Sequence, residues 1–274
     1  RMGHSWAISG QPGRAIEAYE RAKELGTSGS RMQGILGSLY FLSDDWQKSE
    51  AQFEEMLEND PNSVTGIIGL ARLAAARRDL EGAKILFQKA EVAGAEPSLI
   101  AMELATAELL NGNLEKGVSL LEKIVEEYPK LEWPTALLAR IKAKDNRKDA
   151  EALLKSEALA RPVEARTCRE VGATHSLLGN RSDARLWLMQ ALKLAQADTT
   201  TMEYLIQLDL EEGKIDVAKR HAVQLVNYDA DNSVARFALG IYHQVRGENE
   251  EAEAHYRRSL AQTRNLRRVQ PSLR

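Results

Sequence analysis

Apolar residues recur along the chain at intervals typical of amphipathic helices, and residues 233–261 show the pattern clearly. Ala252, Tyr256 and Leu260 follow one another at intervals of four residues. That interval aligns side chains on one face of a helix. Gly247 separates this set from an earlier apolar set, and glycine commonly marks the end of a helix. The stretch therefore predicts two amphipathic helices joined by a tight turn.

The same pattern returns at intervals of about 34 residues, a period in the range of helical repeat arrays. Gly179, Gly213 and Gly247 mark successive turns at this interval. A small residue keeps the phase along the chain, with one interval shorter by a single position, at Ala15, Ser49, Ala83, Gly117, Ala150, Ala184, Ala218 and Ala252. Because one helix pair of this size cannot bury its apolar face alone, the repetition predicts a stack of pairs that cover one another.

The phase of the repeat predicts the organisation of the chain. We expect a partial first repeat over residues 1–29 and a basic tail over 265–274. Between them, residues 30–264 would form seven repeats that start near residues 30, 64, 98, 131, 165, 199 and 233. The unit that starts near 131 has a polar turn without glycine, so we expect the array to bend or soften there. Because the sequence opens inside a repeat, we expect it to be a fragment of a longer chain.

These repeats resemble the tetratricopeptide repeat (TPR) family, whose 34-residue pattern combines Leu-Gly, Tyr, Ala, an aromatic residue and Pro. One repeat matches this pattern at Gly37, Tyr40, Phe53 and Pro61, and another matches at Leu239, Gly240, Ala252 and Tyr256. The sequence departs from the pattern at the usual tryptophan, which is missing, and at the usual tyrosine, which is replaced by His175 and His243 in two repeats. The resemblance implies an all-α fold, a right-handed superhelical solenoid of antiparallel helix pairs.

Composition limits the classes of partner and compartment. The net charge of −3 supplies no strong field that would attract nucleic acid. A single cysteine, Cys168, excludes an internal disulfide and a thiolate metal site. No apolar run approaches the roughly 20 residues of a membrane-spanning helix, so we expect no membrane span. No signal peptide is visible, and the compartment stays open between cytoplasm and periplasm.

Motifs that carry chemistry are missing from the sequence. It contains no HExxH, GxGxxG, P-loop or GxSxG pattern. His221 and His255 lie one repeat period apart, which places them on equivalent faces of neighbouring helices. Two ligands are too few for zinc, which takes three or four. We therefore expect no catalytic residue, no cofactor and no metal site.

The resemblance implies a groove lined by the first helix of each repeat, where TPR proteins bind extended or helical peptides. The residues expected to line it are Arg31, Phe41, Ile68, Arg72, Leu99, Met102, Leu109, Arg166, Arg169, Phe237 and Ile241. The Lys/Arg-and-Asn clamp of chaperone-binding members and the asparagine ladder of sugar-transferase members are both missing from the corresponding positions. An apolar strip with a few charges fits an amphipathic helix or an extended segment. The alternative is that some of these residues pack against the next repeat.

We therefore expect a non-catalytic scaffold that binds a peptide or amphipathic helix of an unidentified protein. One alternative is a structural or assembly segment of a larger bacterial secretion, pilus or exopolysaccharide-export machine. Another is an enzyme whose catalytic domain lies outside this sequence. Self-association is a further expectation, because the partial first repeat would leave an apolar end near Trp6 and Ile8.

Overall fold

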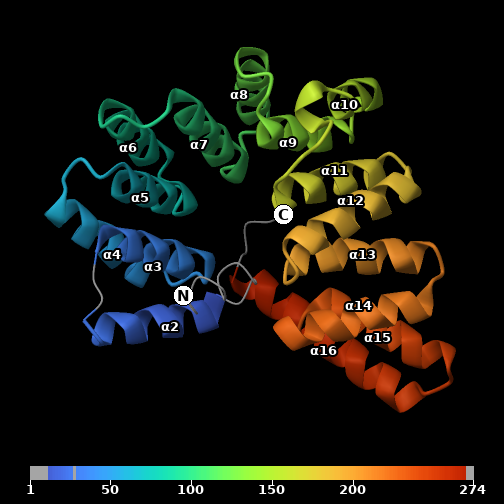
Figure 1. The fold of residues 1–274 in the computed structure, drawn as a ribbon. Helices are drawn as coiled ribbons and strands as arrows, with labels where there is room; N and C mark the ends of the chain where they lie inside the picture. The colour runs from blue at the N-terminus through green and yellow to red at the C-terminus, as the bar shows by residue number, and fades with distance from the viewer. Residues whose placement is uncertain (1–11, 27–28, 270–274) are drawn as a thin grey trace. The chain divides into compact units, whose positions relative to one another are not determined.

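The computed structural model describes residues 12–26 and 29–269, and over these residues it contains helices and no strand (Figure 1). This confirms the all-α prediction. Trp6 and Ile8, on which the expectation of self-association depends, lie outside the described residues, as do residues 270–274 of the expected tail. No helix in the described ranges is both long and apolar enough to cross a membrane.

The chain divides after Pro162 into two compact units. The helices of the first unit are α2 (Pro12–Glu24), α3 (Ser30–Leu42), α4 (Trp46–Asn59), α5 (Val64–Ala76), α6 (Leu80–Val92), α7 (Pro97–Leu110), α8 (Leu114–Glu127), α9 (Glu132–Lys142), α10 (Arg147–Leu154) and the 3₁₀ helix η1 (Glu157–Leu159). Those of the second unit are α11 (Ala165–Leu177), α12 (Arg181–Leu194), α13 (Thr199–Glu211), α14 (Ile215–Tyr228), α15 (Ser233–Val245) and α16 (Asn249–Val269).

Polar side chains begin many of these helices, and a left-handed residue separates the two helices of most pairs. Asp79 accepts a hydrogen bond from the backbone N–H of Gly82 at 2.9 Å, which caps α6. The turn residues Gly112, Gly179, Gly213 and Gly247 have φ between 70° and 86°. Asp44 and Arg78 occupy the same turn position in the first two full pairs, with φ of 58° and 66°. Because side chains disfavour this conformation, these two turns are strained relative to the glycine turns.

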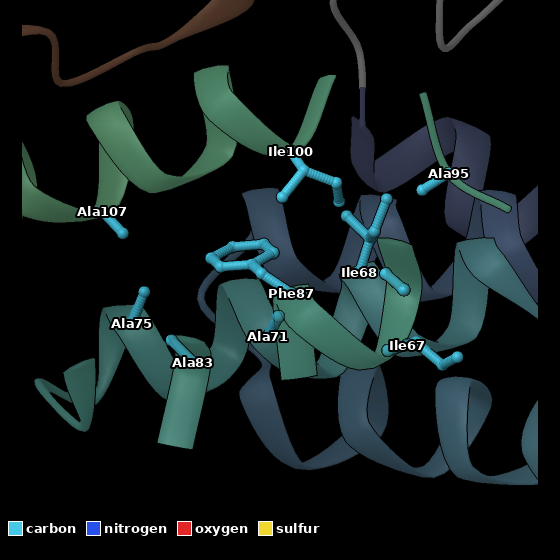
Figure 2. Packing of buried hydrophobic residues seen from close by; sticks show 10 residues of the cluster. Ile67, Ile68, Ala71, Ala75, Ala83, Phe87, Ala95, Ile100 and Ala107 are labelled. Atoms are coloured by element: carbon cyan, nitrogen blue, oxygen red, sulfur yellow. The ribbon is translucent and has the colours of Figure 1, made fainter. Parts of the chain in front are cut away.

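Each helix pair shares its core with the first helix of the next pair. Phe87 of α6 is 1% exposed and lies among Ile67 and Ala71 of α5 and Ile100 of α7 (Figure 2). In the second unit, a cluster from α13, α14 and α15 contains Met202, Ile206, Ala222, Leu225, Ala235, Ala238 and Leu239. A repeat therefore completes its apolar core only when its neighbour is present.

Small residues bring the two helices of a pair close together. A β-carbon at Gly37 of α3 would lie 2.7 Å from the ring of Phe53 in α4. A β-carbon at Gly172 of α11 would lie 2.8 Å from Leu188 in α12. Since real β-carbons do not approach other atoms this closely, the Leu-Gly positions of the repeat are a packing requirement of the helix pair.

Ion pairs connect the second helix of one pair to the end of the next first helix. In the first unit, Arg77, directly after α5, donates to both carboxylate oxygens of Glu50 in α4, at 2.6 and 2.7 Å. In the second unit, Arg185 of α12 donates to Glu212, directly after α13, at 2.5 Å. The two residues of each pair have the same separation along the chain. In the first unit the acid lies in the second helix and the base follows the next first helix, whereas in the second unit these positions are reversed.

The repeat formed by α9 and α10 departs from the others. The second helices α4, α8, α12 and α14 each contain 14 residues, whereas α10 contains 8. The turn before α10 contains no residue in the left-handed conformation. After α10 the chain forms η1, whose Ala158 and Leu159 are buried. The irregular unit of the sequence therefore has a shortened second helix, and the first compact unit ends directly after it.

Candidate binding surface of the first helices

The first helices of the repeats form a layer of their own. In the first unit, α3 contacts α5 and α5 contacts α7, in addition to the contacts of each helix with its own partner. In the second unit, α11 contacts α13 and α13 contacts α15. Figure 1 shows α3, α5 and α7 on one side of the first unit and α4, α6 and α8 on the other. Side chains that leave this layer away from the second helices can reach a ligand.

One exposed part of this layer is the α5–α7 surface, which we define as Arg72, Leu99, Met102, Glu103 and Thr106. The last four residues follow at helical intervals and therefore lie on one face of α7. Leu99 is 39% exposed, whereas Met102 is half-buried and also packs against the core formed by α7, α8 and α9. The hydroxyl of Thr106 donates to the carbonyl oxygen of Met102 at 2.8 Å. This face is thus partly apolar, with its hydroxyl already bonded to the helix.

An ion pair joins α5 to α7 on this surface. Arg72 donates through Nε to Glu103 at 2.9 Å, and its Nη2 donates to the other carboxylate oxygen. The hydrogen bonds to Glu103 raise the pKa of the Arg72 guanidinium. The arginine side chain is 46% exposed, whereas that of Glu103 is only 13% exposed. The charge that this surface offers to a ligand is therefore mainly positive.

Three other residues predicted to line the groove take part in packing. Ile68 is 6% exposed and belongs to the core around Phe87. Phe41 is half-buried and packs against a cluster that contains Phe53. Leu109 is half-buried and lies so close to Gly117 that a β-carbon there would be 2.5 Å from it. These three residues therefore pack against neighbouring helices and do not form an open groove surface. Arg31, also predicted to line the groove, is exposed.

In the second unit, α15 presents a comparable face. Phe237 is 50% exposed, Ile241 is half-buried and Gln244 is exposed. The ring centroid of Phe237 lies 5.7 Å from that of Tyr256 in α16, and the hydroxyl of Tyr256 donates to Gln244 at 2.6 Å. Phe237 therefore reaches solvent and also covers the edge of its own helix pair.

Two of the four arginines predicted to line the groove, Arg166 and Arg169, have acidic partners in the second unit. Arg169 of α11 donates to Asp198 at 2.6 Å, and Asp198 also caps α13 by accepting the N–H of Thr201. Arg166 donates to Glu164 at 2.7 Å on the surface. Arg169 therefore connects two consecutive first helices, a role that a single sequence position does not reveal.

An equivalent polar contact connects the next two first helices. Asn232, the cap of α15, donates to Glu203 of α13 at 2.7 Å. Burial raises the pKa of Glu203, and Asp229 and Asp198 add to this effect, while the bond from Asn232 opposes it. In both cases a residue in the second turn of one first helix contacts the cap of the following one.

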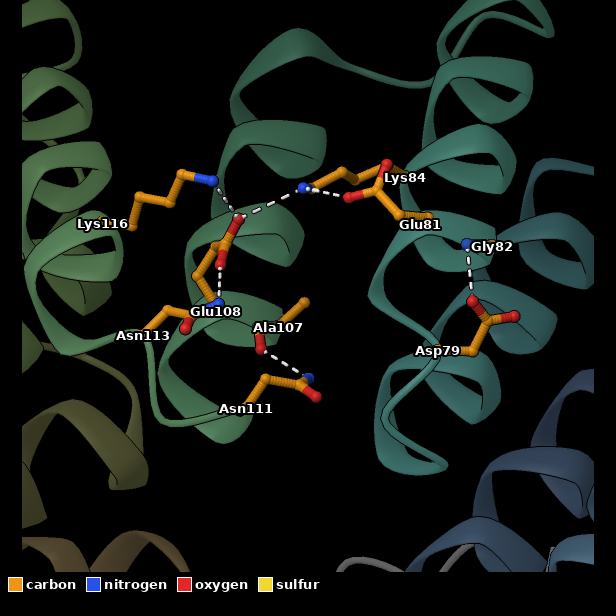
Figure 3. A network of polar contacts seen from close by, with 9 residues as sticks. All are labelled: Asp79, Glu81, Gly82, Lys84, Ala107, Glu108, Asn111, Asn113 and Lys116. Atoms are coloured by element: carbon orange, nitrogen blue, oxygen red, sulfur yellow. Dashed lines mark hydrogen bonds and ion pairs between the residues drawn. The ribbon is translucent and has the colours of Figure 1, made fainter.

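A buried carboxylate on the opposite side of α7 shows a further contact that sequence reasoning missed (Figure 3). Glu108 is 3% exposed and accepts a hydrogen bond from Asn113 at 2.6 Å. Lys84 and Lys116 lie 3.5 and 3.7 Å from it. Burial opposes ionisation, but Asn113, Lys116 and Lys84 together hold the pKa of Glu108 below its ordinary value.

The equivalent residue of the second unit is Asp209, which is fully buried between Arg185 at 2.7 Å and His221 at 2.8 Å. The shared signal in the sequence is a base at the same spacing before each acid, Lys84 before Glu108 and Arg185 before Asp209. These carboxylates hold repeats together. Within the described ranges, no group of three or more His, Cys, Asp or Glu side chains could hold a metal ion.

Comparison with known proteins identifies the repeat. The family model described as tetratricopeptide repeat matches residues 9–64, 68–132 and 205–266, which together make up more than half of the chain. The chain belongs to the tetratricopeptide repeat family. The resemblance drawn from the glycine and aromatic positions is thus confirmed, and TPR proteins are in general non-catalytic scaffolds for protein–protein contacts. No curated protein sequence matches this TPR chain.

Solved structures with a similar fold are also TPR arrays. The crystal structure of the APC/C hetero-tetramer Cut9–Hcn1 matches 95% of this chain and 52% of its own chain, with 13% identity and a TM-score of 0.64. A tetratricopeptide repeat protein from Parabacteroides merdae matches 89% of this chain and 93% of its own, with 14% identity and a TM-score of 0.53. The crystal structure of MamA matches 60% of this chain and 97% of its own chain, with 14% identity and a TM-score of 0.50. The TPR chain spans about half the length of the first of these, and at such identities the similarity shows the fold.

Proposed function

We propose that this TPR protein is a non-catalytic scaffold that binds a peptide or amphipathic helix of a partner protein on the α5–α7 surface. The observation that carries the proposal is the exposed Leu99 beside Met102 on one face of α7, next to the Arg72–Glu103 ion pair. Contiguous exposed apolar side chains with polar groups around them mark interaction surfaces, and Leu99 and Met102 are such neighbours on one face of α7.

The chemistry of the surface defines the ligand that fits it. Leu99 and Met102 offer an apolar contact, and the flexible methionine side chain adapts to different ligand shapes. Arg72 uses two of its five N–H donors for Glu103, which leaves three for carbonyl or carboxylate oxygens of a ligand. The best ligand is therefore a segment with an aliphatic anchor followed by an acidic residue or a free carbonyl group.

Paired substitutions test this function. Leu99→Glu and Met102→Glu introduce a charge at the apolar contact, and Ile85→Glu introduces the same charge at a residue of α6 that is 66% exposed. We expect affinity capture from native lysate, followed by mass spectrometry, to recover a partner with the wild-type protein and with Ile85→Glu but with neither α7 variant. Ile68 is unsuitable for this test because a carboxylate in its buried position would disrupt the core. Equal recovery with all variants, each with an unchanged circular dichroism spectrum, would exclude the α5–α7 surface.

A further inference from the structure

The last two helix pairs contain equivalent side-chain contacts of different chemistry. In α13–α14, Asp209 contacts His221 at 2.8 Å. In α15–α16, the residues one repeat later are His243 and His255, whose rings stack with centroids 5.3 Å apart and an interplanar angle of 10°. The same place in the repeat thus holds an acid and a histidine in one pair and two histidines in the next.

The surroundings of the two histidines contain several charged groups. His243 contacts Glu248 through Nδ1 at 2.6 Å, and Arg246 contacts the same carboxylate at 3.2 Å. Arg236 of α15 and Arg258 of α16 act on His255 as positive charges. Tyr242 packs edge-on against His243, and α14 contributes Lys219, 5.5 Å from the centre of the Tyr242 ring, and Asp216, which acts on Arg246. No carboxylate in the described part of the chain contacts His255.

The histidines of α14 and α16 therefore have different partners. His221 lies against the carboxylate of Asp209, an acidic partner that His255 lacks in the described structure. A proton on His255 places a positive charge against His243, Arg236 and Arg258, and its Nδ1 is buried without a hydrogen-bond partner in the described structure. Like charges in contact disfavour the charged form, as does burial.

The direction of the pH effect follows from these contacts. Burial, followed by Arg236, His243 and Arg258, lowers the pKa of His255 in the folded protein. The unfolded chain takes up this proton near the ordinary histidine pKa of about 6.5. Because the unfolded form then binds more protons, the stability of the hairpin falls as the pH drops below that value.

We propose that the α15–α16 hairpin is an acid-sensitive element, which loosens when His255, stacked on His243, takes up a proton, while α13–α14 stays closed. Glu248 does not account for this opening in mild acid, because its hydrogen bonds with His243 and Arg246 hold its pKa below the ordinary glutamate range. The inference rests on the side-chain contacts alone and is independent of the proposed partner binding.

Hydrogen exchange at pH 7.5 and pH 5.5, corrected for the intrinsic rate at each pH, tests the proposal. For the whole chain, we expect the protection of residues 233–262 to fall at pH 5.5 relative to residues 199–228. The upper limit of this fall is about tenfold, reached when the unfolded chain binds a proton at the ordinary histidine pKa of about 6.5 and the folded hairpin does not. His255→Gln removes the proton acceptor, and His243→Asp reproduces the acid–histidine contact of Asp209 and His221. Both variants are expected to keep their protection at pH 5.5.

Two results would overturn the proposal. One is an equal relative protection of residues 233–262 in the wild-type protein at both pH values. The other is an acid loss in the variants as large as in the wild type. Circular dichroism at pH 7.5 establishes which of the two variants is folded. One folded variant is enough to test whether the acid loss persists, because both substitutions remove the stacked histidine pair.

Discussion

Gly240 of α15 lies directly against the ring of Tyr256 in α16, so that a β-carbon at residue 240 would overlap the ring. We predict that Gly240→Ala lowers the free energy of unfolding by about 1–3 kcal/mol, the usual cost of an overpacked core. We expect Gly240→Arg to unfold the C-terminal hairpin first. Urea unfolding measures the first change, and proteolysis of residues 233–262 the second.

A helical glycine in open space serves as the control for that prediction. A β-carbon at Gly13 of α2 would meet nothing within 4 Å. Gly13→Ala should therefore leave stability unchanged or raise it by up to about 1 kcal/mol through helix propensity. If both alanine variants behaved alike, close approach would not be the reason for glycine at position 240.

The strained turn at Arg78 leads to a stabilising prediction. Its φ is 66°, whereas the equivalent turn residues Gly179 and Gly213 have no side chain to strain. Arg78→Gly should raise the free energy of unfolding by about 0.5–1 kcal/mol. This is the backbone strain that the substitution removes, minus the entropy that glycine adds to the unfolded chain. The reverse change, Gly213→Arg, should lower it by about 1 kcal/mol. Thermal unfolding of both variants would show opposite shifts; shifts of the same sign would contradict the prediction.

The core of the first unit is expected to depend strongly on Phe87. This ring is 1% exposed and contacts residues of both neighbouring first helices. We predict that Phe87→Ala costs about 3–5 kcal/mol, because the cavity would open between two repeats at once. Ile85→Ala in the same helix, at an exposed residue, should change stability by less than about 0.5 kcal/mol. Denaturant unfolding of both variants compares the two positions.

The buried Glu108 leads to a prediction about acid. Its pKa is held below the ordinary value, so its ionised form stabilises the folded state above the ordinary glutamate range. That contribution should disappear as the pH falls through the lowered pKa. We predict that Glu108→Gln flattens the loss of stability between about pH 5 and pH 3, while Glu91→Gln, an exposed glutamate of α6, leaves it unchanged. Identical pH profiles for the wild type and Glu108→Gln would contradict this prediction.

The sequence predicted the helix pairs well because their signals are local and repeated. The backbone of a helix pair requires a glycine at most turns and a small residue where the two helices approach closely. These requirements recur at a constant phase, and the TPR assignment rests on them. The groove was less predictable. Ile68 and Leu99 were both predicted to line the groove, yet Ile68 is buried and Leu99 is exposed. Burial depends on how large the facing side chains of the next repeat are, which no single repeat position specifies.

Polar contacts between repeats were the least visible feature of the sequence. The bond between Arg72 and Glu103 joins two first helices, and Arg169 reaches Asp198 in the same way. Such pairs look like ordinary surface charges until the register of neighbouring helices is known. They also remove Arg169 from the set of charges free to bind an acidic ligand, which changes the expected character of the surface.

The exchanged charges of the Glu50–Arg77 and Arg185–Glu212 pairs make the order of the repeats part of the fold. If α12 were followed by the end of α5, two arginines would meet, and if α4 were followed by the end of α13, two glutamates would meet. Like charges in contact disfavour such arrangements. Repeats that share one backbone shape are therefore not interchangeable parts, and a chain that paired the wrong neighbours during folding would be penalised at the junction.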